Sequence, residues 1–236
     1  MIHIQNLNHH YGRFHSLHDI NIDIPQGSLT GLIGPNGAGK STLMKILAGF
    51  LVPSSGSVVV GGVSTEQDPI LARRKVGYMP ETPALYRELR VEEYLDFVSV
   101  LKGLSREETL KERDYLIQCC GLSKILKKLI GGLSKGNRQR VALAQALIGS
   151  PEVILLDEPT SALDPAQVME IRNFIKSIGG QKTVLMSSHI LSEIAQICDR
   201  IVFIRDGRMV FQSDPKGNAL GLSQTQLESL FEKGIL

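Results

Sequence analysis

The chain has 236 residues, of which 42% are hydrophobic and 21% charged, a composition typical of a globular protein that buries a core. This excludes a short peptide or a small domain held together by disulfides. No apolar run approaches the roughly 18 residues that cross a bilayer. The net charge of +2 is spread along the chain, so charge alone does not indicate nucleic acid. Because residues 1–12 lack the pattern of a secretory leader, we expect a cytoplasmic protein.

The cysteines and histidines do not indicate a metal or redox site. Neighbouring cysteines such as Cys119 and Cys120 rarely bridge, and with Cys198 they form no C-x-x-C pair. We therefore predict three buried, reduced thiols. Five of the six histidines lie before residue 19, but the adjacent His9 and His10 would point to opposite faces of a strand. No ligand set with metal spacing is visible there.

The first region combines an antiparallel part with a strand, a glycine loop and a helix. Alternation at 2–7 and 19–24 predicts half-exposed strands, and 52–62 supplies a turn and another strand. The short apolar run at 28–34 is typical of a buried strand, and 41–50 has the apolar spacing of a helix. An antiparallel β piece is therefore expected beside a unit of the nucleotide-binding type.

The second region, about 82–150, is predicted to be a helical insert. The apolar residues of its first helix recur at helical spacing and should form one face. They are Val91, Tyr94, Leu95, Val98 and Leu101. Ser105 and Glu108 have the spacing of a capping box at the start of the next helix.

The third region returns to strands that alternate with helices. Residues 153–156 are continuously apolar, which predicts a strand covered on both faces. Asp164 should cap a helix that ends at the glycines 179–180, and 182–189 follows as a strand. The pair 206–207, Asp-Gly, closes a hairpin. This alternation predicts an α/β fold with a mainly parallel sheet.

We expect one domain over 1–236. Its core and antiparallel β part would span about 1–81 and 151–218, on either side of the helical insert. A C-terminal helix is predicted at about 223–233 and should dock on its own domain through one apolar face. That face consists of Leu227, Leu230 and Phe231.

Residues 34–41 fit the pattern G-x-x-x-x-G-K-[ST], the Walker A motif, between a buried strand and a helix. Glycines let backbone N–H groups turn toward phosphate oxygens, and the helix N-terminus adds positive potential. Lys40 would reach the β- and γ-phosphates, and the Ser41 hydroxyl would ligate Mg²⁺. The alternative is a glycine turn that merely caps a helix. The predicted nucleotide-binding residues here are Gly34, Pro35, Asn36, Gly37, Ala38, Gly39, Lys40, Ser41 and Thr42.

Two carboxylates, Asp157 and Glu158, follow the apolar strand 153–156, at the strand end where open α/β sheets bind ligands. This is a Walker B pattern. Asp157 would belong to the Mg²⁺ shell, and Glu158 would accept a proton from the attacking water. Taken alone, the segment more often forms a strand followed by a solvated turn. Together with the glycine loop, the catalytic interpretation is favoured.

With these motifs the sequence resembles the ATP-binding cassette (ABC) family over nearly the whole chain. The most specific element is LSKGNRQR at 133–140, just before a predicted helix. The resemblance implies a P-loop NTPase fold with a RecA-like core, and a signature that contacts ATP held by a second, oppositely oriented copy. Ser134, Gly136 and the helix N-terminus would form an anion site. Without the other motifs, these residues would be interpreted as a serine that caps a helix with a basic first turn. The signature residues are Leu133, Ser134, Lys135, Gly136 and Asn137.

The resemblance implies roles for further positions. Tyr11 would stack on adenine, although half-buried tyrosines at strand ends are common. His189 matches the switch histidine that bonds the γ-phosphate, and it would act in catalysis with Glu158 and Lys40. Four residues resemble the loop that crosses the dimer interface. They are Ser161, Ala162, Leu163 and Asp164.

Two features depart from the usual family pattern. Glu81 stands where the family usually has glutamine, in the loop between core and insert. Its carboxylate can ligate Mg²⁺ or orient water, but it adds negative charge beside the phosphates. The signature contains SKGN where SGGQ is commonest, so Lys135 adds charge and Asn137 shortens a side chain. Both variants resemble those of single-cassette ATPases in multidrug, polysaccharide or lipid-type exporters, which favours export over import.

The sequence therefore predicts an ATP- and Mg²⁺-dependent ATPase subunit of a membrane transporter, peripheral on the cytoplasmic face of the cell membrane. The resemblance implies a head-to-tail dimer of this chain with itself or with a similar subunit. Hydrolysis at Glu158 would open the pair and drive a separate integral-membrane permease. No nucleic-acid partner is expected.

Two alternative classes use related chemistry. Soluble cassette ATPases that serve DNA repair, chromosome structure or the ribosome generally carry paired cassettes, zinc modules, coiled coils or basic arms, which this sequence lacks. A small-molecule kinase or GTPase would leave LSKGNRQR unexplained. The sequence also lacks an Asn-Lys-x-Asp segment that reads guanine.

Overall fold

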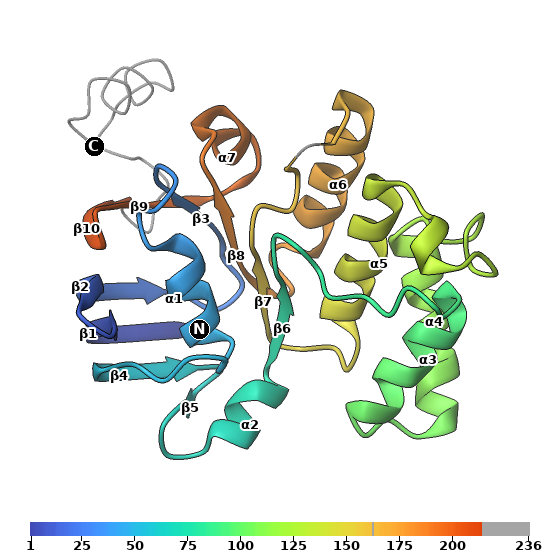
Figure 1. Cartoon of the computed structure of the whole chain (residues 1–236), viewed down its shortest axis with the longest axis horizontal. Helices are drawn as coiled ribbons and strands as arrows, with labels where there is room; N and C mark the ends of the chain where they lie inside the picture. The colour runs from blue at the N-terminus through green and yellow to red at the C-terminus, as the bar shows by residue number, and fades with distance from the viewer. Residues whose placement is uncertain (162, 214–236) are drawn as a thin grey trace.

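The computed structural model describes residues 1–161 and 163–213, and within them the strands form two sheets (Figure 1). The smaller sheet consists of β1 (Ile2–Tyr11), β2 (Phe14–Ile24), β4 (Ser55–Val60) and β5 (Val63–Ser64). The larger sheet consists of β3 (Leu29–Ile33), β6 (Val76–Met79), β7 (Val153–Leu156), β8 (Thr183–Ser188), β9 (Arg200–Arg205) and β10 (Arg208–Gln212). The predicted C-terminal helix, about 223–233, lies outside the described residues.

The smaller sheet is antiparallel, in the order β2-β1-β4-β5. Its central strand β1 places Ile2 opposite Ile24 of β2 on one side and Val60 of β4 on the other. These three side chains are buried, because alternate residues of each strand face the same core. The predicted antiparallel β piece is confirmed.

The larger sheet has the order β10-β9-β3-β8-β7-β6. The strands from β9 to β6 pair in parallel, and only β10 at the edge runs antiparallel, through the predicted hairpin from β9. The tight turn is made by Asp206 and Gly207, both in the left-handed region that a type I′ turn requires. The mainly parallel sheet is therefore as predicted.

Helices lie on both sides of the larger sheet, and α1 lies between the two sheets (Figure 1). They are α1 (Lys40–Leu47), α2 (Pro69–Arg74), α3 (Val91–Leu101), α4 (Arg106–Cys119), the 3-10 helix η1 (Ile130–Gly132), α5 (Lys135–Leu147), α6 (Pro165–Ile178) and α7 (Leu191–Ile197). The sequence analysis did not single out α2, β6 or α7. Each has seven residues or fewer, too short for its periodicity to be read.

Both faces of the larger sheet are covered by apolar cores. In β7, Ile154 and Leu156 pack toward α5, α6 and α7, whereas Val153 and Leu155 pack toward α1 and the smaller sheet. All four side chains are fully buried. This explains why the strand is continuously apolar, since alternate residues enter different cores.

The helix caps predicted for α4 and α6 are confirmed. Ser105 and Glu108 form the predicted capping box at the start of α4. Asp164 caps α6 by accepting a hydrogen bond from the backbone N–H of Gln167 at 2.9 Å. These local interactions satisfy N–H groups that have no partner inside the helix.

Two packing predictions were wrong. Leu101 does not join the buried face of α3, because it is the last residue of that helix and is 69% exposed. Of the three cysteines, Cys120 alone is buried, whereas Cys119 and Cys198 are half-buried. Cys119 packs against the same core as Cys120 but keeps part of its surface exposed.

Helix α5 packs closely on the larger sheet over Gly77 of β6. A Cβ at this position would overlap the backbone oxygen of Ala146 in α5 and lie 2.9 Å from Pro151 Cγ. We expect Gly77→Ala to lower the free energy of unfolding by about 1–3 kcal/mol, the usual cost of overpacking. Chemical denaturation monitored by circular dichroism measures it. Gly132→Ala is the control, because nothing lies within 4 Å of a Cβ there. Equal stability of the two variants would contradict the packing of α5 on β6.

Candidate nucleotide-binding site

The site forms where parallel strands end at one edge of the larger sheet. The neighbours β3, β8, β7 and β6 run in the same direction, so the residues after them converge. They lead into the glycine loop, His189, the pair 157–158 and Glu81, respectively. A cavity of about 650 Å³ opens there. Predicted site residues that line it are Tyr11, the segment 36–42, Glu81, Glu158, Ser161 and His189.

The glycine loop joins β3 to α1 with two residues in the left-handed region. Gly37 has φ of 81° and Gly39 has φ of 102°, which residues with side chains rarely adopt. At Gly39 a Cβ would also lie 2.7 Å from the side chain of Leu17. The loop therefore requires glycine for its conformation, and it leads directly into the N-terminus of α1, where positive potential favours anions.

Lys40 is a buried cation at the start of α1, only 6% exposed. Its ammonium donates hydrogen bonds to the carbonyl oxygens of Gly34 at 2.7 Å and Pro35 at 3.1 Å. Burial lowers the pKa of Lys40, while the carboxylates of Glu158, Asp157 and Glu81 oppose that shift. The anionic oxygens of a triphosphate would provide the compensating charge that a buried ammonium favours.

The carboxylates after β7 are fixed by a serine that sequence reasoning missed. Ser187 of β8 donates a hydrogen bond to Asp157 Oδ1 at 2.6 Å and accepts one from the backbone N–H of Glu158 at 2.9 Å. Asp157 is 2% exposed, and Glu158 has a left-handed backbone with φ of 49°. Such a conformation persists only where surrounding contacts hold it. No motif marks this serine, because its role depends on the pairing of β7 with β8.

Glu158 lies between two side chains that come from other strand ends. Its Oε1 is 3.7 Å from Lys40 Nζ, and its Oε2 is 3.0 Å from His189 Nδ1. The Glu158 side chain is nearly buried, whereas His189 is exposed on the wall of the cavity. Glu158, Lys40 and His189, the three residues predicted to act in catalysis, therefore lie close together. A carboxylate in this position can accept a proton from a water molecule in the cavity.

An aromatic pair also lines the cavity. Tyr11 and Phe14 are paired across the hairpin of β1 and β2, and they are 44% and 65% exposed. Exposed rings of this kind offer a stacking surface for a planar base. The sequence analysis named only Tyr11. Phe14 follows it by three residues across a turn, so the alternating pattern of the strands could have placed both rings together.

The predicted metal ligands have the right chemistry for Mg²⁺. Ser41 and Glu81 line the cavity, and the buried carboxylate of Asp157 lies beside Glu158. All three offer oxygen, which Mg²⁺ prefers. Among the described residues no cluster of three His, Cys, Asp or Glu could hold a metal alone. This donor set fits an ion that takes one or two carboxylates and shares the oxygens of a bound phosphate.

The signature residues lie away from this cavity. Ser134 caps α5 by accepting a hydrogen bond from the backbone N–H three residues further on, and Gly136 is buried against the side chain of Gln167 in α6. The exposed Lys135 instead lines a separate cavity of about 180 Å³ with Glu81. None of the residues 133–137 lines the cavity of the glycine loop. The fold therefore does not bring the two predicted phosphate-binding segments of one chain together.

The predicted interface loop is divided between the cavity and the core. Ser161 lines the cavity, Leu163 packs against the core, and Asp164 caps α6. Ala162 lies outside the described residues.

Taken together, the parallel sheet, the glycine loop and the paired carboxylates define a P-loop nucleoside triphosphatase. Comparison with known proteins narrows this class. The family profile described as ABC transporter matches residues 17–161, which is more than half of the chain. A second profile, described as an AAA domain, putative AbiEii toxin, type IV TA system, matches residues 129–195.

Individual relatives agree with the first profile. The lantibiotic transport ATP-binding protein SrtF of Streptococcus pyogenes is 38% identical, covering 100% of this chain and 98% of the relative. A solved structure described as the ATP-binding subunit of an ABC transporter superimposes with a TM-score of 0.89 and 29% identity, covering 100% of both chains. Another is a dimeric ATP-binding cassette in a post-hydrolysis state, bound to ADP and Pi. It has a TM-score of 0.82 and 27% identity, covering 91% of this chain and 98% of the other.

The chain belongs to the ABC transporter family, as an ATP-binding and ATP-hydrolysing subunit. The family predicted from the motifs, the P-loop fold and the ATPase activity are thereby confirmed.

The hydrogen bonds of Ser187 give a prediction for the site. Ser187→Ala leaves the buried Asp157 oxygen and the Glu158 N–H without their shared partner, so we expect a loss of about 1–3 kcal/mol in stability. Because both carboxylates lose their positioning, ATP hydrolysis should slow and need more Mg²⁺ for half-maximal rate. Denaturation and Mg²⁺ titration of the ATPase rate measure these effects. The control is Ser177→Ala, whose exposed hydroxyl donates a hydrogen bond to Phe174 O. An unchanged Mg²⁺ requirement would exclude a positioning role.

Proposed function

We propose that this ATPase works as a head-to-tail dimer that drives a separate integral-membrane partner, in a transporter of the export type. The observation that carries the proposal is the separation of the signature from the cavity. Ser134 caps the start of α5, a helix N-terminus that favours anions, yet none of the described residues 133–137 lines the cavity of the glycine loop. A second copy in the opposite orientation would place this helix end against the cavity. The dimeric cassette structure supports this arrangement.

Within one copy, the cavity would bind ATP in three parts. Tyr11 would stack on the adenine, with Phe14 beside it. The loop 34–42 would hold the phosphates through its N–H groups, the start of α1 and the Lys40 ammonium. Ser41 and Asp157, with Glu81 as a third oxygen donor, would hold Mg²⁺, which neutralises phosphate charge when bound.

Hydrolysis would use the residues that converge on Glu158. Its carboxylate would take the proton from the attacking water, whose oxygen bonds to the γ-phosphorus as ADP leaves. His189, now 3.0 Å from Glu158, would turn its imidazole to the γ-phosphate. Lys40 would stabilise the charge on the transferred group. The partner copy would add Ser134 and Gly136, and the loop 161–164 would line the interface between the copies.

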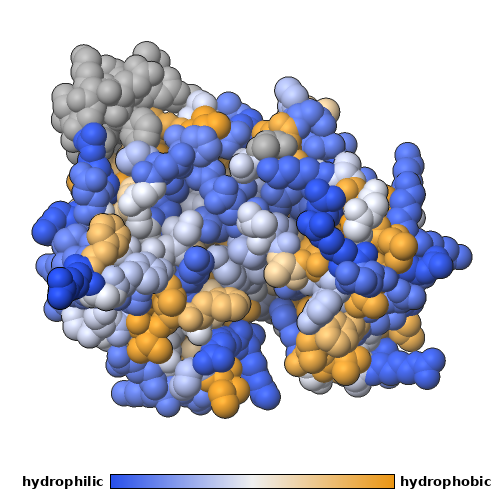
Figure 2. Space-filling model, viewed as in Figure 1, coloured by the Kyte–Doolittle hydropathy of each residue, from blue (hydrophilic) through white to orange (hydrophobic). Residues whose placement is uncertain are grey.

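The membrane partner would dock on the edge opposite the sheet's ligand-binding end. Within the described residues, no helix has the length and apolar character to cross a membrane. Figure 2 shows a notch at the lower edge, with hydrophobic residues on both sides. Ile70 of α2 and Leu101 of α3 are exposed apolar residues that line one cavity of about 630 Å³. We infer that this surface faces the membrane partner on the cytoplasmic side.

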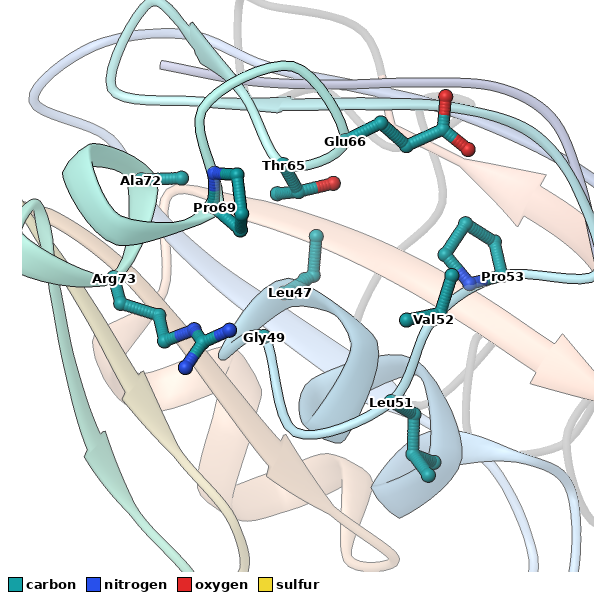
Figure 3. Close-up of a pocket in the computed structure, with 10 residues that line it drawn as sticks. All are labelled: Leu47, Gly49, Leu51, Val52, Pro53, Thr65, Glu66, Pro69, Ala72 and Arg73. Atoms are coloured by element: carbon teal, nitrogen blue, oxygen red, sulfur yellow. The ribbon is translucent and has the colours of Figure 1, made fainter.

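A cavity beside α2 extends this surface. It has a volume of about 390 Å³ and lies between the end of α1, the loop after it and α2. Figure 3 shows Leu47 of α1 between Pro69 of α2 and Val52 of the loop. Arg73 borders the cavity, so an apolar segment with an acidic residue would suit it. The export assignment is supported by the lantibiotic transport relative and by the Glu81 and SKGN variants.

The role of Glu158 can be tested separately from ATP binding. We expect Glu158→Gln to bind ATP normally, to lose roughly 10²–10⁴ in hydrolysis rate and to accumulate as a dimer with ATP, because the proton acceptor alone is removed. Steady-state ATPase assays and size-exclusion chromatography with light scattering measure this. Glu152→Gln, at the exposed residue just before the same strand, is the control. Normal turnover in Glu158→Gln would remove this residue from its role.

The transport assignment is tested by what the chain binds in the cell. Tagged chain is purified from gently solubilised membranes and, in parallel, from the soluble fraction, and co-purifying proteins are identified by mass spectrometry. A multi-span partner is expected, and Ile70→Glu on the notch should release it while ATPase activity persists. Recovery with ribosomal proteins or nucleic acid, and without a membrane protein, would overturn the transport assignment but leave the ATPase chemistry intact.

A further inference from the structure

The end of α4 places two thiols side by side, far from the nucleotide cavity. Cys119 is the last residue of the helix and Cys120 follows it, with their sulfur atoms 3.7 Å apart. Both are free thiols. Cys119 is half-buried and Cys120 is 4% exposed. Two sulfurs at this distance can bind the same atom without a change in the helix.

The two thiols open into a small cavity between helices. It has a volume of about 150 Å³, and both cysteines line it together with Arg140 of α5 and Glu170 and Phe174 of α6. Arg140 and Glu170 form an ion pair that joins α5 to α6. The cavity therefore lies at the seam between the helical insert and α6, and it gives the buried Cys120 access to small molecules.

The two sulfurs differ in reactivity. The hydrogen bond between the two thiols lowers the pKa of Cys119, while the same contact and burial raise the pKa of Cys120. Cys119 is therefore the first nucleophile, since the thiolate is the reactive form. Burial also raises the pKa of Cys198, which has no second thiol beside it.

We propose that Cys119 and Cys120 form a chelating dithiol site for trivalent arsenic compounds of the type R–As=O. Soft centres of this kind favour sulfur ligands. Each thiol forms one As–S bond, the As–O double bond breaks, and the oxygen leaves as water with the two thiol protons. Arsenic stays trivalent, so no oxidant or reductant is needed. The R group would occupy the cavity, where Phe174 offers an apolar wall.

Phenylarsine oxide tests this on the full-length, reduced protein. The protein is treated, desalted and exposed to excess mercaptoethanol or dimercaptopropanol before its intact mass is recorded. We expect one phenylarsenic unit per chain that withstands mercaptoethanol, a monothiol, and is removed by dimercaptopropanol. Only an arsenic atom held by two protein sulfurs has this resistance.

Three variants assign the adduct to its residues. Cys119→Ser and Cys120→Ser should each lose the mercaptoethanol-resistant adduct, and Cys198→Ser should keep it. Cys119→Ser changes a half-buried position, so this variant tests the proposal even if Cys120→Ser does not fold. ATPase activity of Cys119→Ser would confirm that the variant has the native fold. A resistant adduct that persists in Cys119→Ser, or a wild-type adduct that mercaptoethanol removes, would overturn the proposal.

Discussion

The parallel register of β3, β8, β7 and β6 is the constraint on which the site depends. Ile33 pairs with Ser188, and Leu156 pairs with both Met186 and Met79, so the four strands end nearly level. The glycine loop, His189, the two carboxylates and Glu81 follow these ends within one or two residues. Because side chains alternate between faces, a slip of one residue in any strand would turn its functional side chain away from the cavity.

Charge and strain concentrate at this edge and are held there by specific partners. Lys40 and Asp157 are buried ionisable groups, and Glu158 has a backbone conformation unusual for a residue with a side chain. A carbonyl oxygen of the glycine loop accepts a hydrogen bond from Lys40, and Ser187 forms hydrogen bonds with both Asp157 and Glu158. Buried polar groups of this kind are tolerated only when they are paired. The apolar cores on both faces of the sheet supply the rigidity that keeps these short hydrogen bonds aligned.

The helical insert gives the molecule its second set of surfaces. It carries the signature on α5, half of the apolar notch on α3 and the paired thiols at the end of α4. None of the three lies in the nucleotide cavity. The proposed phosphate site between copies, the proposed docking edge and the small cavity at the seam would therefore respond to different partners, while the sheet holds the chemistry in place.

The sequence by itself determined the features that depend on neighbouring residues: the glycine loop, the buried strand β7, the caps of α4 and α6 and the hairpin after β9. Their signals are local, because they come from backbone conformation and from hydrogen bonds across three or four residues. Only the tertiary structure decided that Ser187 joins Asp157 to Glu158 and that Leu101 faces solvent. Ser187 lies some thirty residues from its partners, and the order of the strands, which no short pattern encodes, decides such contacts.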